Sequence, residues 1–260
     1  MKCCCCAGAE DYQLLADIGF DGIELPGAAM AAVPQEDWDE LKEKIMNGPI
    51  PCIGFNAALP PEIKICGPGF DLALTEKYAE LLCRRLHDLG GKTIGIGSPG
   101  SRILPKGFNP VMARAQMEEF LVLFAKTADF WDIMVCWETL NPAETNFGLS
   151  FVEDGGIIRD LVNRGMDNVG LIADLFHMIV NENTAEEAAG MSDLIRHIHI
   201  AEPPADFRGY PTKAYASRYR ELLDAILQNT QCHTISIETS HPMSAACAGD
   251  ALEFIRQLCG

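Results

Sequence analysis

Basic residues are scarce in this chain. Its 260 residues include 20 Lys and Arg against 37 Asp and Glu, so the formal net charge is −17 at pH 7. A field of this sign repels phosphate backbones and anionic membrane surfaces. We therefore expect neither a nucleic-acid partner nor a membrane partner, although a small basic pocket remains compatible with this charge.

Long apolar runs are absent as well. No stretch approaches the roughly 18 consecutive apolar residues that a bilayer-spanning helix requires. The short apolar run at the N-terminus meets Glu10 and Asp11 too early for a secretory signal. That run is also not followed by GxGxxG, which argues against a dinucleotide-binding fold. The lack of a membrane-spanning run and of a secretory signal predicts a cytoplasmic protein.

Cysteine, by contrast, is abundant, with 11 residues. The number is odd and the spacing is not that of a disulfide framework, so we expect buried reduced thiols. Four of them, Cys3–Cys6, are consecutive, and adjacent side chains of a strand point to opposite faces. This alternation disfavours a zinc–thiolate site of the CxxC type in that run.

Short apolar runs and segments of helical periodicity alternate eight times along the chain. We expect strands at residues 2–7, 21–25, 50–55, 92–97, 132–138, 169–174, 194–201 and 233–238. We expect helices at residues 12–19, 34–46, 75–89, 110–130, 151–164, 184–191, 214–229 and 244–258. Continuously apolar strands are typical of parallel sheets that are covered on both faces. Eight such units predict an α/β fold, a (β/α)8 TIM barrel that forms a single domain over residues 1–260. A doubly wound open sheet is the competing arrangement.

Polar side chains stand where four of the expected strands end: Glu138, Asp174, His199 and Glu238. In a (β/α)8 barrel the carboxyl ends of all strands meet at one face, so we expect these four to converge there. Three carboxylates and one imidazole suit a hard divalent cation, Mn²⁺ before Mg²⁺, Co²⁺ or Zn²⁺. The alternative, for any one of these residues, is a polar side chain that contacts solvent at a strand end and binds no metal.

The segments around these residues resemble the xylose-isomerase-like TIM barrel superfamily, in its sugar phosphate isomerase/epimerase branch, which includes ketose 3-epimerases. The resemblance covers nearly the whole chain and is carried by the segments Trp137–Asn146, Asp174–His177, His197–Glu202 and Ile237–Glu238. It implies that Glu138, Asp174, His199 and Glu238 bind one divalent metal. It further implies that Glu138 and Glu238 are the acid/base pair of a metal-dependent isomerase or 3-epimerase of a small ketose or keto-sugar, acting through an enediolate.

The resemblance also implies substrate contacts. His177, three residues after Asp174, is expected in a loop beyond the strand, where it reaches the substrate and not the metal. Glu144 matches a glutamate near the reacting carbons, and Arg208 matches a substrate-binding arginine, although the gap before it is longer here than in the ketose 3-epimerases. Arg102 could bind a carboxylate or phosphate or form a structural pair.

Two further polar residues fall on the inner side of the expected strands. Glu24 ends the second strand and could shape the pocket floor, although a place in the core or behind the metal ligands is favoured. His197 is expected one layer beneath His199 as buried structure.

Other functions remain open. The same enolate could expel a leaving group, as in an inosose-dehydratase-like lyase or a β-elimination from a keto-glycoside. An endonuclease IV-like nuclease is opposed by the negative charge, and a non-catalytic sugar-binding protein by the intact pair of glutamates. The sequence is compatible with a homo-oligomer and does not indicate which sugar is bound or whether it is phosphorylated.

Overall fold

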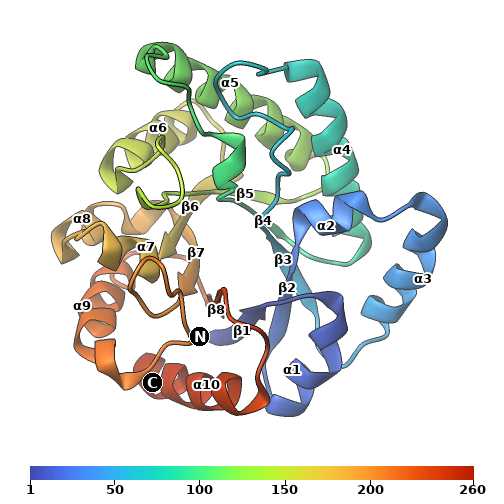
Figure 1. Ribbon diagram of the computed structural model, residues 1–260, viewed down its shortest axis with the longest axis vertical. Helices are drawn as coiled ribbons and strands as arrows, with labels where there is room; N and C mark the ends of the chain where they lie inside the picture. The colour runs from blue at the N-terminus through green and yellow to red at the C-terminus, as the bar shows by residue number, and fades with distance from the viewer.

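The predicted barrel is present. The computed structural model describes residues 1–260, and its eight parallel strands close into a barrel in chain order, with β1 paired to β8. The strands are β1 (Lys2–Cys6), β2 (Gly22–Pro26), β3 (Cys52–Asn56), β4 (Thr93–Ile96), β5 (Met134–Glu138), β6 (Val169–Asp174), β7 (Ile195–Ile200) and β8 (Thr234–Ile237). Helices surround the strands as an outer ring (Figure 1).

Every predicted helix is present, within a few residues of its predicted bounds. The helices are α1 (Tyr12–Ile18), α2 (Gly27–Ala32), α3 (Gln35–Met46), α4 (Leu72–Asp88), α5 (Pro110–Asp129), α6 (Phe151–Asn163), α7 (Leu175–Val180), α8 (Ala185–Gly190), α9 (Ala216–Ile226) and α10 (Ala245–Cys259). Helix α4 begins earlier than predicted because Asp71 caps it, accepting hydrogen bonds from the backbone N–H groups of Ala73 and Leu74.

Two helices, α2 and α7, were not predicted. Each has six residues, which is less than two turns. A segment of that length does not repeat its apolar spacing often enough to be separated from a loop. The second omission matters for the site, because α7 begins directly after Asp174.

The alternation of side chains along β5 is as expected for a filled barrel. Val135 and Trp137 are fully buried. The Trp137 indole points to the helix layer, where its Nε1 donates to Asp154 Oδ2 of α6 at 2.9 Å. Glu138 therefore has the opposite direction, toward the barrel interior.

The cysteines are buried free thiols, as predicted. All eleven are free and nine of them are buried. Burial raises the pKa of Cys5 to about 12, so this thiol is protonated near neutral pH. The four cysteines of β1 do not converge on one point: only Cys6 lies beside other candidate ligands, Glu24 and His199.

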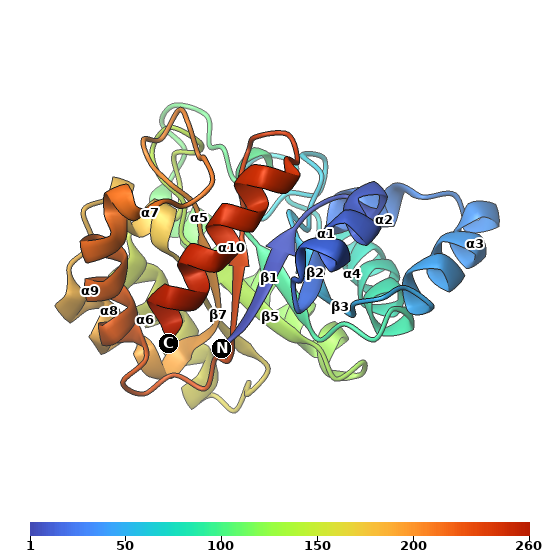
Figure 2. The same ribbon diagram turned by 90° about the horizontal axis from the view of Figure 1, so that it is seen from below.

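Both chain termini lie at one end of the barrel, and the strands run away from it (Figure 2). The loops that follow β7 and β8 rise side by side at the opposite end, joined by a hydrogen bond from Ser240 N–H to the Arg208 carbonyl oxygen at 3.0 Å. No helix has the length and apolar character needed to cross a membrane.

Candidate active site and metal centre

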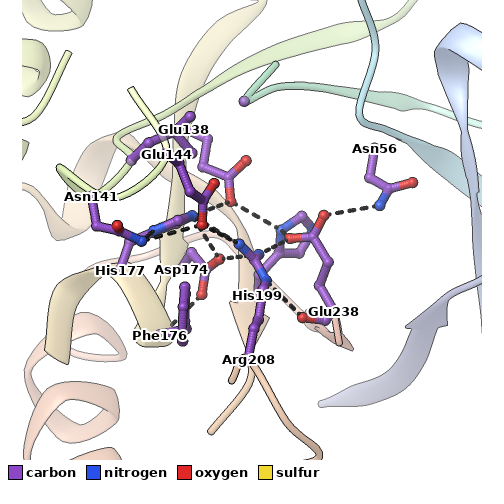
Figure 3. Close-up of polar contacts among 12 residues, drawn as sticks. Asn56, Glu138, Asn141, Glu144, Asp174, Phe176, His177, His199, Arg208 and Glu238 are labelled. Carbon is purple, nitrogen blue, oxygen red and sulfur yellow. Dashed lines mark hydrogen bonds and ion pairs between the residues drawn. The ribbon is translucent and has the colours of Figure 1, made fainter. Parts of the chain in front are cut away.

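The four strand-end residues come together at the carboxyl face of the barrel (Figure 3). Ligand atoms of Glu138, Asp174, His199 and Glu238 all lie within 4.8 Å of one another. Glu138 ends β5 and Asp174 ends β6, and Asp174 is paired in register with His199 of β7. Glu238 follows β8 directly. Parallel register thus brings together side chains that are up to a hundred residues apart.

His199 lies between the two glutamates. Its Nδ1 is 2.9 Å from Glu238 Oε2 and 3.5 Å from Glu138 Oε1. Burial lowers the pKa of His199, but the negative charges of Glu238 and Glu24 outweigh burial and raise it. A field that favours an imidazolium also favours a bound cation, because both place positive charge among the same carboxylates.

Glu24 contacts the far side of His199. Its Oε2 is 3.4 Å from His199 Nε2, and its Oε1 accepts a hydrogen bond of 2.6 Å from His197 Nε2. Burial opposes ionisation of Glu24, but the two imidazoles outweigh it and hold the pKa of this carboxyl well below its ordinary value. An ionised Glu24 keeps a proton on His199 Nε2, so that Nδ1 is the nitrogen facing the cluster. The expectations of Glu24 behind the ligands and of His197 beneath His199 are met.

Asp174 serves the fold and the cluster with different oxygens. As N-cap of α7 it accepts the Phe176 backbone N–H through Oδ1 at 2.9 Å. Its Oδ2 accepts a hydrogen bond of 2.7 Å from Arg208 Nη2. The cap thereby fixes the orientation in which Asp174 presents Oδ2 to the site.

His177 lies beside the cluster, but not in the predicted loop. It belongs to the first turn of α7, which Asp174 caps. Its Nδ1 accepts from Asn141 Nδ2 at 2.9 Å, and the Asn141 amide is oriented by the Ala143 N–H, which donates to Oδ1 at 2.9 Å. Burial lowers the pKa of His177 to about 4, so the ring is neutral and its proton is on Nε2. This nitrogen lies 3.0 Å from Arg208 Nη1.

Arg208 reaches the cluster despite the long gap that precedes it. Its Nη2 donates to Asp174 and Glu238, and its Nη1 lies 3.4 Å from Glu144 Oε1. The guanidinium also stacks over the Phe176 ring at 4.7 Å. Arg208 and Glu144 thus lie at the site, where the sequence placed them.

Arg102 has a different position from the one that substrate binding requires. It is fully buried, and its Nε and Nη2 donate to the Gly97 carbonyl oxygen while Nη2 also donates to that of Glu138 at 2.8 Å. The guanidinium stacks on the Trp137 ring at 4.2 Å. The prediction of Arg102 as a ligand for substrate is therefore corrected: its contacts are structural, and they fix the backbone that carries Glu138.

The structure adds a residue that the sequence did not single out. Asn56 ends β3, and its Nδ2 donates to Glu238 Oε1 at 2.9 Å. Its position at a strand end is the signal that could have identified it, since the four cluster residues share that position.

Two buried polar atoms of the cluster have no hydrogen-bond partner: Glu138 Oε1 and His199 Nδ1. The short distance from Nδ1 to Glu238 does not provide one, because the groups are not aligned. Buried polar atoms without partners are costly and uncommon in proteins. An oxygen and a nitrogen left open beside two further carboxylates form a donor set that fits a divalent cation.

A cavity of about 500 Å³ opens beside the cluster. It is lined by Cys6, Ala7, Gly8, Pro26, Asn56, Glu144, Ala205, Asp206, Phe207, Arg208, Glu238, Thr239 and Ser240. A larger groove of about 630 Å³ lies outside the barrel between α4 and α5 and contains no residue of the cluster. Convergent polar groups, and not size, therefore identify the candidate site.

Comparison with known families agrees with the barrel fold. The family model of the xylose isomerase-like TIM barrel matches residues 12–258. The chain belongs to this family. Within the xylose isomerase-like family, it is 24% identical over 201 residues to the 3-dehydro-D-guloside 4-epimerase of Escherichia coli (strain K12), covering 74% of this chain and 73% of that one.

Solved structures share the xylose isomerase-like fold. The D-psicose 3-epimerase from Clostridium cellulolyticum H10, solved with D-tagatose, superposes with a TM-score of 0.80 at 19% identity and covers 99% of both chains. The protein IOLI, solved with a bound zinc atom, superposes with a TM-score of 0.73 at 18% identity, covering 100% of this chain and 96% of that one.

Proposed function

We propose that this chain is a divalent-metal-dependent epimerase of a small keto-sugar. The observation that carries the proposal is the placement of Glu138 and Glu238 on either side of His199 Nδ1, with ligand atoms of all three and of Asp174 within 4.8 Å. The names of the two epimerases that the chain resembles add support. A 3-dehydro sugar inverted at C4 and a 2-ketose inverted at C3 both change the carbon next to a carbonyl.

Glu138, Asp174, His199 and Glu238 would hold the metal. A divalent cation at such a site supplies Lewis acidity, which makes the hydrogen next to a sugar carbonyl more acidic. Mn²⁺ is the ion we expect from the oxygen-rich donor set, and Zn²⁺ is the alternative that one histidine allows.

The two glutamates would move the proton. One carboxylate takes the proton from the carbon, and the electron pair of the broken C–H bond forms the C=C bond of an enolate while the carbonyl pair moves onto oxygen. The other carboxylate returns a proton to the opposite face of that carbon, which inverts it. Burial tends to raise the pKa of Glu238, but Arg208 and His199 outweigh it and lower this pKa far below its ordinary value, so Glu238 is ionised.

His177 and Arg208 would bind the substrate oxygens. His177 Nε2 and Arg208 Nη1 lie 3.0 Å apart, so one substrate oxygen that gains negative charge could accept hydrogen bonds from both once the Arg208 N–H turns from the ring to that oxygen. Glu144 lies beside Arg208 and can accept a hydrogen bond from a sugar hydroxyl.

Solvent deuterium tests the proposal. Ketohexoses and 3-keto-hexopyranosides would be incubated with the protein and Mn²⁺ in D₂O, and deuterium at the carbon next to the carbonyl would be followed by NMR. We expect exchange together with the inverted sugar. Release of water or an alcohol without inversion would identify a lyase that uses the same enolate, and no reaction with any keto-sugar would refute an enzymatic role on these sugars.

Gly97 is predicted to control the position of Glu138. A Cβ added at Gly97 would lie 2.2 Å from Glu138 Oε2, which is closer than non-bonded atoms approach. Gly97→Ala should therefore displace the carboxylate and lower the epimerisation rate at least tenfold. Gly190→Ala is the control, because a Cβ there meets nothing within 4 Å and its φ is not positive. An unchanged rate in the Gly97 variant would show that Glu138 does not need this position.

Glu24 is predicted to set the metal affinity. Glu24→Gln leaves an acceptor for His197 but removes the charge that holds the His199 tautomer. Loss of such a partner commonly weakens metal binding about 10–100-fold. Titration calorimetry of the metal-stripped protein with Mn²⁺ measures the effect. Glu43→Gln removes the same charge from an exposed position of α3 and should leave the affinity unchanged. Equal effects of the two changes would show that Glu24 acts only through its charge at long range and not through its contact with His199.

A further inference from the structure

The cavity beside the cluster extends beyond the reacting groups. At its inner end Asn56, Arg208 and Glu238 contact or belong to the cluster, and Glu144 contacts Arg208. Its outer part is lined by residues 205–207 of the loop after β7, by residues 6–8 at the end of β1, and by Pro26, Thr239 and Ser240. At about 500 Å³ it falls within the range of about 300–1,000 Å³ that holds ligands larger than one small ring.

The loop at 203–208 is held in place at both ends. Glu202 and Gly209 exchange two backbone hydrogen bonds of 2.8 and 3.0 Å at its base. The Phe207 N–H donates to the Pro204 carbonyl oxygen at 2.9 Å, and Thr239 Oγ1 donates to that of Arg208 at 2.8 Å. Residues 203–207, which lengthen the gap before Arg208, thus form a wall of the cavity that is held by hydrogen bonds.

Phe207 is the aromatic residue of this wall. Its ring lies against His241, with centroids 4.5 Å apart, and His241 Nε2 is 3.1 Å from the Phe207 carbonyl oxygen. Gly209 lies beneath the ring, since a Cβ there would be 2.0 Å from Phe207 Cε1. Phe207 is nevertheless 45% exposed and lines the cavity. A supported aromatic ring that remains open toward a polar site offers an apolar surface for a ligand.

Small residues supply another part of the cavity lining. Ala7 and Gly8 follow β1, and Pro26 ends β2. None of them has a long side chain that could fill the cavity.

The charges of the cavity disfavour an anionic group in this space. Arg208 is the one cationic side chain in the lining, and the three carboxylates that contact it, Asp174, Glu144 and Glu238, outnumber its single positive charge. Asp206 adds negative charge to the outer wall. A phosphate there would meet this surplus of negative charge, whereas a neutral sugar ring can lay its C–H face on an aromatic ring and direct its hydroxyls to Ser240 and Asp206.

We propose that this outer part is a subsite for a neutral second ring, so that the substrate is an unphosphorylated glycoside of a keto-sugar. The keto ring lies at Glu138 and Glu238, and the ring attached to it packs on Phe207. The inference rests on the proposed function and specifies its substrate class.

The experiment compares two substrates that share one keto ring: a methyl 3-keto-hexopyranoside and the disaccharide in which a hexose replaces the methyl group. Deuterium incorporation with Mn²⁺ gives kcat/KM for each. The wild type should prefer the disaccharide, and Phe207→Ala should lower the ratio of the two kcat/KM values about tenfold, as expected for lost contact area of one partly exposed aromatic ring. Phe207→Tyr should retain the ratio.

Two controls isolate the subsite. Phe130→Ala removes a phenylalanine that is 82% exposed at the end of α5, outside the cavity, and should leave the ratio unchanged. Ala7→Leu enlarges another lining residue of the cavity and should lower the ratio as Phe207→Ala does. The subsite is disproved if both cavity variants exchange the two glycosides in the wild-type ratio, or if the wild type prefers a ketose phosphate; the epimerase then still stands. Absence of exchange on every keto-sugar would instead remove the proposed function together with the subsite.

Discussion

Replacing Glu138 by glutamine should abolish inversion of the keto-sugar while allowing exchange from one face only. Glutamine keeps the shape and an oxygen but cannot accept the proton, which removes a factor of about 10²–10⁴ from proton transfer. Glu238 would still remove the hydrogen that faces it. The Glu138 variant should therefore wash deuterium into one epimer without inverting it, and Glu238→Gln should do so with the other epimer.

The measurement is NMR of each purified epimer in D₂O at saturating Mn²⁺, so that weaker metal binding by the variants does not enter. Glu119→Gln, an exposed position of α5, is the matched control and should behave as wild type. Arg102 holds the Glu138 backbone, so without metal the Glu138 variant should have the same unfolding temperature as the metal-free wild type. Identical exchange of both epimers in either variant would contradict two bases on opposite faces.

Removal of the metal is predicted to have the second large effect. Treatment with a chelator should abolish epimerisation, and Mn²⁺ should restore it. Because the four ligands are assembled only in the folded chain, a cation should also stabilise the fold. At 100 times its dissociation constant the gain is about 2.7 kcal/mol, which thermal unfolding with and without Mn²⁺ can detect.

Asp174→Asn tests the same site without an activity assay. The amide keeps the cap on Phe176 through its oxygen but replaces a charged ligand atom, so most of the metal-dependent stabilisation should disappear. Asp129→Asn, exposed at the end of α5, should retain it. Full activity in chelated protein, or an equal gain in stability by both variants, would show that the cluster is not the metal centre.

The convergence of the cluster could be predicted because it depends on topology. Once eight apolar runs alternate with helices, a parallel barrel places every strand end at one face, and Glu138, Asp174, His199 and Glu238 are strand ends. Alternation along each strand then decides which side chains point inward, and it placed His197 beneath His199 correctly.

Features that depend on short segments or on distant partners could not be read from the sequence. Helix α7 has too few residues for a periodic pattern, so His177 was expected in a loop. The two arginines were indistinguishable as charges after glycine- or proline-rich loops. What separates them is their surroundings: Arg102 is enclosed by backbone oxygens and Trp137, and Arg208 faces three carboxylates.

The buried guanidinium of Arg102 has a consequence for engineering. It ties the end of β4 to the end of β5, so the wall that bears Glu138 is stiff and independent of the segment at 203–207. That segment is fastened at Glu202–Gly209 and to the neighbouring loop alone. Replacing residues 203–207 by segments of other lengths, with Arg208 kept, should therefore change which aglycones the barrel accepts while its proton-transfer groups keep their spacing.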